Sequence, residues 1–366
     1  MNRREWPAGN KFSEVAYMTV SAAYFKAILV SVSAAMLAML GVSASAMAQE
    51  PMAGLQAQSG PRLDFPAGLA TDGRAIYVSN SRNNTIEAID ATSKSLRIVA
   101  GKLFQQGSND GTGDSARFNS PDGMTISGQD LYLCDTNNSD IRKINVGSGT
   151  VTTIAGTANI SGTEDGTGAA AHFNLPTQIA TDGTSLYVAD SGNSSIRRIT
   201  LADMKVKTIG GQPGTSGKTE GNQDKSQFSG PRGIAVDKKA IYIADTGNDV
   251  IRKIDISTLQ TSTIAGTGEE GDKDGPALQA QFNDPGAICT DGTTLYVLDA
   301  DNHSIRKIDL TANTVTKLTL VNGHIGSGCA LTSDGKQLYF SDTTENAVEV
   351  VDTTSGNFTT LYPPGQ

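Results

Sequence analysis

Short apolar runs separated by turn-forming residues succeed one another along most of the chain. Between residues 233 and 266 the runs read GIAVD, AIYIAD, VIRKID and TSTIAG, with Gly, Asp, Asn, Ser and Thr between them. Runs this short, rich in β-branched residues and bounded by turn residues, are typical of β-strands joined by tight turns. Four of them in succession predict a four-stranded antiparallel meander.

The same four runs recur at a nearly constant spacing. Copies anchored on a proline begin at Pro66, Pro121, Pro176, Pro231 and Pro285, and a sixth copy without the proline begins near Gly328. A four-stranded unit repeated in this way is the signature of a propeller, in which each copy forms one blade. The sequence therefore predicts an all-β fold, a six-bladed β-propeller of four-stranded antiparallel blades over residues 61–362.

Two recurring side chains are predicted to be structural. The second run carries a Tyr in every copy, at Tyr77, Tyr132, Tyr187, Tyr242, Tyr296 and Tyr339. Four copies also end the second run on Asp and begin the third with Ile-Arg, which gives the pairs Asp135–Arg142, Asp190–Arg197, Asp245–Arg252 and Asp299–Arg306. A guanidinium donates well to a carboxylate. Because both features repeat, we interpret them as blade packing and ion pairing, not as a catalytic site.

Three long blocks carry a family resemblance. They read LYVADSGNSSIRRI (186–199), IYIADTGNDVIRKI (241–254) and LYVLDADNHSIRKI (295–308), and they resemble the NHL repeat. The resemblance covers residues 61–362 and implies a six-bladed propeller. It also implies a binding scaffold, since most similar bacterial proteins have no assigned activity. Some similar propeller lyases hold zinc through histidines near the channel, a ring that the inner strands of this chain lack.

The N-terminal segment has a different composition. Residues 27–42 are apolar and uncharged, Lys26 precedes them, and Ala46-Met47-Ala48 follows with small residues at the two positions that a signal peptidase reads. This pattern predicts a signal peptide over residues 1–48 that is cleaved after Ala48, with Met18 as an alternative start. The run is shorter than the ~20 residues that span a bilayer, so we expect no stable membrane anchor.

The predicted organisation is then a signal peptide (1–48), a short linker (49–60), the propeller (61–362) and a C-terminal tail (363–366). A cleaved signal peptide predicts a periplasmic or extracellular protein. The formal net charge of −9 argues against a nucleic-acid partner, because phosphate binding requires clustered Lys and Arg.

No motif predicts a metal, a cofactor or a catalytic residue. The three histidines, His172, His303 and His324, lack the spacing of a zinc motif. The acidic loops 109–114 and 269–274 lack the alternating ligands of a calcium loop, so we interpret them as solvated turns. We therefore predict no cofactor. Calcium or zinc is possible as a ligand, but no motif spacing supports either.

The position after each proline varies between copies and lies at the predicted channel mouth. It is occupied by Ala67, Asp122, Thr177, Arg232, Gly286 and, in the sixth copy, Cys329. The next position is small except at Gln178. Polar groups that converge in this way are typical of a ligand pocket, although exposed rim residues show the same pattern. We predict Asp122, Thr177, Gln178 and Arg232 as the ligand-binding residues.

The three cysteines lie in predicted strands. Cys134 and Cys289 occupy positions that hold small residues in other copies, which predicts buried hydrophobic side chains. Cys289 and Cys329 fall in neighbouring inner strands, and an exported protein permits a disulfide there. When the copies are aligned, the positions of Cys289 and Cys329 differ by three residues, which predicts unfavourable geometry for that bond.

These observations predict an exported binding scaffold that presents its loop face and channel mouth to a protein, peptide or glycan. A metal-dependent lyase or hydrolase at the channel mouth is the alternative, and a purely structural surface protein is a third hypothesis.

The leader makes one prediction about the mature protein. The single tryptophan of the chain is Trp6, so cleavage after Ala48 leaves a protein without tryptophan. Protein extracted from the cell envelope should therefore show tyrosine fluorescence alone. A tryptophan emission band would mean that the leader is retained.

Overall fold

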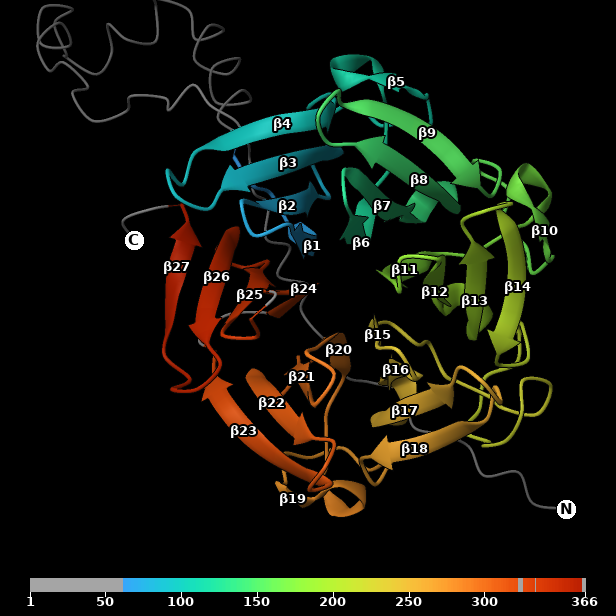
Figure 1. The fold of residues 1–366 in the computed structure, drawn as a ribbon, viewed down its shortest axis with the longest axis vertical. Coiled ribbons are helices and arrows are strands. Elements are labelled where there is room, and N and C mark those ends of the chain that lie inside the picture. Colours follow the sequence, from blue (N-terminus) through green and yellow to red (C-terminus); the bar gives the residue numbers. More distant parts are fainter. Residues whose placement is uncertain (1–61, 322–324, 333, 364–366) are drawn as a thin grey trace, which may run out of the picture. The chain divides into compact units, whose positions relative to one another are not determined.

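The computed structural model describes residues 62–321, 325–332 and 334–363. The predicted signal peptide and linker, as well as His324, lie outside these residues. Within them the chain forms 27 strands in six antiparallel sheets, and the sheets surround a central axis as the blades of a propeller (Figure 1). The predicted six-bladed β-propeller is confirmed. In the described part of the chain, no helix is long and apolar enough to cross a membrane.

The first three blades follow one another along the chain. Blade 1 comprises β1 (Pro66–Thr71), β2 (Ala75–Asn80), β3 (Thr85–Asp90) and β4 (Leu96–Gly101). Blade 2 comprises β6 (Pro121–Ser127), β7 (Asp130–Asp135), β8 (Asp140–Asn145) and β9 (Thr150–Ala155). Blade 3 comprises β11 (Pro176–Thr181), β12 (Ser185–Asp190), β13 (Ser195–Thr200) and β14 (Lys205–Gly210).

The last three blades repeat this plan. Blade 4 comprises β15 (Ile234–Val236), β16 (Ala240–Asp245), β17 (Val250–Asp255) and β18 (Thr261–Ala265). Blade 5 comprises β20 (Pro285–Thr290), β21 (Thr294–Asp299), β22 (Ser304–Asp309) and β23 (Thr314–Leu320). Blade 6 comprises β24 (Ile325–Leu331), β25 (Gln337–Asp342), β26 (Ala347–Asp352) and β27 (Phe358–Tyr362).

The loops that link the fourth strand of one blade to the first strand of the next, here called linking loops, add short elements. Three of them contribute a two-residue strand to the outer edge of blades 2, 3 and 5: β5 (Gly111–Thr112), β10 (Gly166–Thr167) and β19 (Gly275–Pro276). Single 3₁₀ turns follow these strands or the second strands: η2 (Gly113–Ser115), η3 (Thr136–Asn138), η4 (Gly168–Ala170), η5 (Ser191–Asn193), η6 (Thr246–Asn248) and η7 (Ala277–Gln279). The fifth strands were not predicted.

The inner strands meet closely around the axis. A Cβ added to Gly233 would lie 2.1 Å from the carbonyl oxygen of Gly286 in the next blade, and one on Gly328 would lie 2.0 Å from that of Ala67. Contacts this short have no room for a side chain, so glycine is required at these two positions. The small residues predicted for the inner strands thus permit the six blades to converge.

The register of blade 6 corrects the sequence prediction. Ile325 pairs with Asp342 as Pro285 pairs with Asp299, so the blade begins at Ile325 and Gly328 occupies the glycine position two residues into the other inner strands. The position after the blade start is therefore Gly326, and Cys329 does not belong to the variable ring. The error arose because blade 6 lacks the proline and carries one additional residue in its inner strand.

The predicted offset of three residues between Cys289 and Cys329 is wrong for the same reason. In the correct register Cys289 and Cys329 are one position apart, and their Cα atoms are separated by 6.0 Å. This separation lies within the normal range for a disulfide. A Cys289–Cys329 disulfide accordingly joins the inner strands of blades 5 and 6, whereas Cys134 is a free and buried thiol, as predicted.

The ring closes without a strand exchanged between its ends. Each of blades 1 and 6 is built entirely from consecutive strands, and β1 lies beside β24. Ser341 donates a hydrogen bond of 2.9 Å to the carbonyl of Ala67 across this junction. Blades 1 and 6 are therefore held together by packing and a few polar contacts, while every other junction is also bridged by the chain itself.

This closure predicts where the propeller opens first. Backbone amides of blades 1 and 6 should exchange with solvent faster than those of blades 3 and 4, because local opening begins where the fewest stabilising links cross a boundary. Hydrogen exchange read by mass spectrometry after proteolysis measures this order. Blades 3 and 4 exchanging first would contradict it.

Candidate functional site

Four buried arginines organise the loop face of the propeller. The guanidinium groups of Arg142, Arg197, Arg252 and Arg306 lie 2.8, 2.8, 3.0 and 2.7 Å from the carboxylates of Asp135, Asp190, Asp245 and Asp299, respectively. All eight side chains are fully buried. The predicted structural pairs are confirmed, and burial explains their role: a buried charge is tolerated when it is paired and hydrogen-bonded.

Each of these arginines also rests on an aromatic ring. The guanidinium carbon lies 5.1–5.3 Å from the ring centroid of the buried Phe118, Phe173, Phe228 or Phe282. A cation at this distance over an aromatic face is attracted by the ring. The Phe that precedes each of blades 2 to 5 thereby fixes the linking loop to the arginine.

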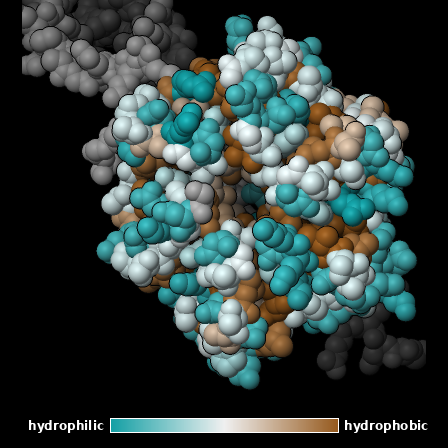
Figure 2. Space-filling model, in the orientation of Figure 1, coloured by the Kyte–Doolittle hydropathy of each residue, from teal (hydrophilic) through white to brown (hydrophobic). Residues whose placement is uncertain are grey.

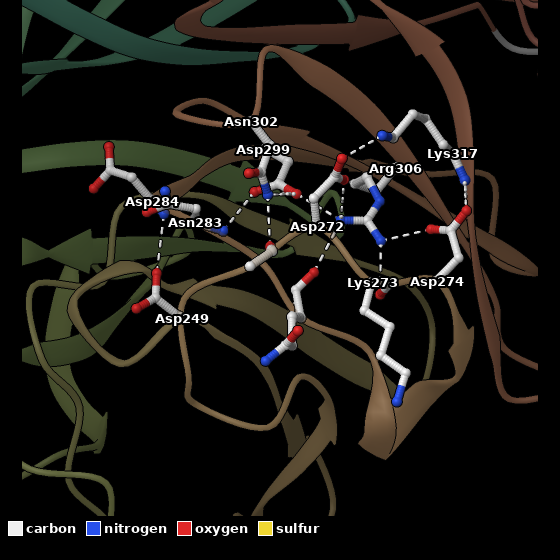
Figure 3. A network of polar contacts seen from close by, with 12 residues as sticks. Asp249, Asp272, Lys273, Asp274, Asn283, Asp284, Asp299, Asn302, Arg306 and Lys317 are labelled. Carbon is white, nitrogen blue, oxygen red and sulfur yellow. Dashed lines mark hydrogen bonds and ion pairs between the residues drawn. The ribbon is translucent and has the colours of Figure 1, made fainter.

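The arginines recruit the acidic linking loops as well. Arg142 donates to Asp110 at 2.8 Å, and Arg306 donates to Asp274 at 2.6 Å. Figure 3 shows Arg306 between Asp299, Asp272 and Asp274, with Lys317 bound to the outer carboxylates. Asp110 and Asp274 belong to the loops interpreted from the sequence as solvated turns. In the structure these carboxylates hold the linking loops to the blades.

Blades 1 and 6 lack this arrangement. In blade 1 the amide of Asn80 donates to Glu87 at 2.8 Å, and the Thr85 hydroxyl donates to the same oxygen at 2.8 Å. Burial raises the pKa of Glu87. In blade 6 Glu349 accepts from Thr360, and burial likewise raises the pKa of Glu349. Hydrogen bonds from uncharged donors thus replace the ion pair in the two blades that form the ring junction.

Hydroxyl groups connect successive blades at the channel mouth. In blades 1 to 4, the turn between the second and third strands begins with Ser or Thr. The hydroxyl of this residue donates a hydrogen bond to the carbonyl of the proline that starts the next blade. The pairs are Ser81–Pro121, Thr136–Pro176, Ser191–Pro231 and Thr246–Pro285. Blade 5 has Ala300 at this position and no hydroxyl to donate. The Cys289–Cys329 disulfide lies at this same junction and joins the two blades covalently.

The four side chains predicted to bind a ligand line one pocket. Asp122, Thr177, Gln178 and Arg232 surround a space of about 700 Å³ at the channel mouth. Other lining residues are Phe65, Arg82, Asp284, Gly286 and Thr343. Figure 2 shows a hollow at the centre of the propeller face that is turned to the viewer.

Arg232 faces an acidic neighbour in this pocket. Its guanidinium lies 3.0 Å from the carboxylate of Asp284, which precedes the inner strand of blade 5. Both side chains are partly exposed, so solvent screens the pair and it contributes little to stability. Thr177 is held by Ser191, whose oxygen lies 2.6 Å away. The pocket therefore offers fixed donors and acceptors on blades 3 to 5.

Phe65, Arg82 and Asp284 are among the pocket residues that were not predicted. Phe65 and Asp284 directly precede inner strands, and Arg82 lies in the β2–β3 turn. The position before the proline also varies between blades (Phe65, Ser120, Leu175, Gly230 and Asp284), so the same repeat comparison that found Arg232 would have found these residues.

The two histidines that the structure describes lie in different loops. His172 contacts Glu164 at 3.1 Å on a linking loop, and His303 lies in the turn after β21. Among the residues that the structure describes, no group of three His, Cys, Asp or Glu side chains is arranged to hold a metal ion.

The fold and its repeated units define the chain as a six-bladed β-propeller, and comparisons with known proteins agree. No protein-family profile matches the chain. NHL repeat-containing protein 2 of Bos taurus is 29% identical over 290 residues, which cover 69% of this chain and 40% of that protein. The human protein is 28% identical over 294 residues. The matched part of the chain thus spans about 40% of the length of these two relatives. Fold and similarity together are consistent with an NHL-repeat family.

Solved structures share the architecture at low identity. A protein from a nidogen/laminin complex superimposes with a TM-score of 0.56 at 15% identity, covering 77% of this chain and 92% of the other. A virginiamycin B lyase of Staphylococcus aureus, crystallised with quinupristin, gives 0.51 at 13% identity, covering 82% and 85%. At these identities the likeness concerns the fold alone.

One buried carboxyl group in blade 2 has no partner. Asp140 starts β8, is fully buried, and neither of its carboxyl oxygens has a hydrogen-bond partner. Burial, together with the negative charge of Asp135, raises the pKa of Asp140 to about 8. The same position holds Ser195 in blade 3 and Ser304 in blade 5. Asp140 therefore keeps its proton at neutral pH and contributes no charge to the loop face.

This carboxyl group should make stability depend on pH. An unfolded Asp ionises near pH 3.9, whereas folded Asp140 holds its proton to about pH 8. The unfolded state binds fewer protons in this window, so the free energy of unfolding falls as the pH rises through it. Asp140→Ser should raise that free energy by about 2–5 kcal/mol at pH 8 and by much less near pH 4.

Urea unfolding between pH 4 and pH 9 measures the effect. Ser195→Asp in blade 3 is the matched control and should introduce the same pH-dependent loss. A difference between wild type and Asp140→Ser that stays constant with pH would show that Asp140 is not protonated in the folded protein.

Proposed function

We propose that this propeller is an exported binding scaffold that takes a segment of a protein, peptide or glycan at its channel mouth. The observation that carries the proposal is the convergence of Asp122, Thr177, Gln178 and Arg232 on one pocket. These side chains come from three different blades and differ from the residues at the same positions elsewhere in the ring. Repeated residues build the fold, whereas differences between copies give one side of the mouth its own chemistry.

The pocket has the size and composition of a ligand site. A volume of about 700 Å³ falls within the range of small-molecule pockets and suits a few residues of a longer chain. Arg232 donates in a fixed geometry, Asp122 and Asp284 accept, and Gln178 can do both. The rigid blades below hold these groups in place, which reduces the entropy lost when a ligand binds.

Two features support export. The leader has the pattern of a cleaved signal peptide, and the Cys289–Cys329 disulfide suits an oxidising compartment. A periplasmic or extracellular location would place the loop face in contact with envelope proteins, peptides or glycans. The metal-dependent lyase or hydrolase alternative stays a prediction, because no observation on the described residues favours it.

Arg232→Ala tests the mouth. The variant should lose binding of a mouth ligand by about 5- to 150-fold, since a lost charge-assisted hydrogen bond costs roughly 1–3 kcal/mol. Its melting temperature should stay within a few degrees of wild type, because the Arg232–Asp284 pair is exposed. Wild type and variant are compared on a printed array of peptides and oligosaccharides, with thermal melts alongside.

Lys238→Ala serves as the control, since Lys238 lies on a different pocket. Equal binding by wild type and Arg232→Ala would show that the mouth is only a solvated rim. A large fall in melting temperature would instead make Arg232 a strut between blades 4 and 5.

A further inference from the structure

Blade 1 departs from its sister blades at three positions on the loop face. Phe65 precedes the inner strand, where other blades hold Ser120, Leu175, Gly230 and Asp284. Arg82 lies in the β2–β3 turn, where the others hold Asn137, Gly192, Gly247, Asp301 and Thr344. Phe104 lies at the tip of the first linking loop, where the next loops hold Asn159, Gly214 and Gly268. Blade 1 alone combines two aromatic rings and a cation at these positions.

The two phenylalanines occupy unfavourable backbone conformations. The φ angles are 58° at Phe65 and 60° at Phe104, in the left-handed region that favours glycine and asparagine. Asn159, Gly214 and Gly268 have the same positive φ at the turn tip, with residues suited to it. The position of Phe65 also has a positive φ in other blades, at Ser120 (50°), Leu175 (47°), Gly230 (53°) and Asp284 (53°), so the repeat imposes the angle but not the aromatic ring. The fold would be satisfied by glycine at either position, so packing does not explain the rings.

The rings are exposed and flank one turn. Phe104 is 76% exposed and Phe65 is 38% exposed, the latter within the lining of the mouth pocket. The guanidinium carbon of Arg82 lies 4.9 Å from the centroid of the Phe65 ring. The next residue, Asn83, accepts a hydrogen bond of 3.0 Å from the backbone N–H of Phe104. The β2–β3 turn thus carries one ring on its mouth side and anchors the backbone of the other.

Both guanidinium groups beside these rings are already paired. Arg82 lies 3.4 Å from Asp64, and Arg232 lies 3.0 Å from Asp284. An anionic ligand would have to displace one of these carboxylates and would also meet those of Asp122 and Asp301, whereas a cationic ligand would meet both guanidinium groups. The apolar side chains in the mouth other than Phe65 are only the small Ala287 and Ala300, which form no deep pocket for an apolar peptide side chain. The ligand that fits these residues is uncharged, is rich in hydroxyl groups, and has one flat apolar face.

From this combination we propose that Phe65, Arg82 and Phe104 form a stacking surface for a neutral glycan chain that enters the channel mouth. Each aromatic ring presents a rigid apolar face to the C–H face of a sugar ring. Arg82, Asp284, Gln178 and Arg232 then hydrogen-bond the hydroxyl groups at the edge of the sugars. This inference rests on the proposed function and selects the glycan among its ligand classes.

The test uses the mature chain and a printed array of neutral oligosaccharides, followed by titration calorimetry with a bound hexasaccharide and its disaccharide. Phe104→Gly should weaken hexasaccharide binding about three- to tenfold, the effect of one lost stacking contact, and leave the disaccharide unaffected. Phe65→Gly should weaken both. Neither variant should lower the melting temperature, because Gly230 and Gly214 occupy the same positions in other repeats.

Ile160→Thr is the matched control, since Ile160 is an exposed apolar residue on the next linking loop and Thr215 is its counterpart one loop further. It should bind as wild type does. The inference is overturned if no neutral oligosaccharide binds, or if hexasaccharide binding is unchanged in Phe104→Gly. Peptide binding that is lost in Arg232→Ala would, in either case, leave the proposed function standing.

Discussion

The loop face of this propeller depends on burying a guanidinium group in each of four blades. One arginine side chain bonds the Asp at the end of the second strand, the linking loop and the face of a Phe. Removing the Asp would leave an unpaired charge in a buried site, which costs several kcal/mol. The arrangement therefore forces the linking loop and the turn between second and third strands into one position. These two loop types carry Asp284 and Asp301 of the mouth, beside the inner strands that carry Asp122, Thr177 and Gln178.

Repetition made most of the fold predictable. A residue that recurs at the same position in four to six copies is best explained by the fold, and this comparison identified the Tyr position and the Asp–Arg pairs. The same comparison brought Asp122, Thr177, Gln178 and Arg232 to one pocket. Asp284 and Phe65 were not predicted, because they lie before the proline, whereas the predicted residues come from the two positions after it.

What could not be predicted lies where the repeat is irregular. Blade 6 has no proline to mark its start and one more residue in its inner strand, so counting along the sequence misplaced Cys329 and with it the disulfide. The lack of any partner for Asp140 depends on how its neighbours pack in three dimensions. Such features follow from register and burial, which a single sequence specifies only through the folded structure.

Closure by packing alone has a consequence for how the molecule can be rearranged. Every blade is made of consecutive residues, and the first and last described segments approach each other, since the charge of Arg62 acts on Tyr362. The location of the junction between blades 1 and 6 therefore depends on which blade comes first along the chain, and not on the structure of the blades themselves. A circular permutant joined at residues 62 and 363 and opened in the linking loop between blades 3 and 4 would carry its seam to that loop. The blade architecture thus does not itself fix the position of the chain ends.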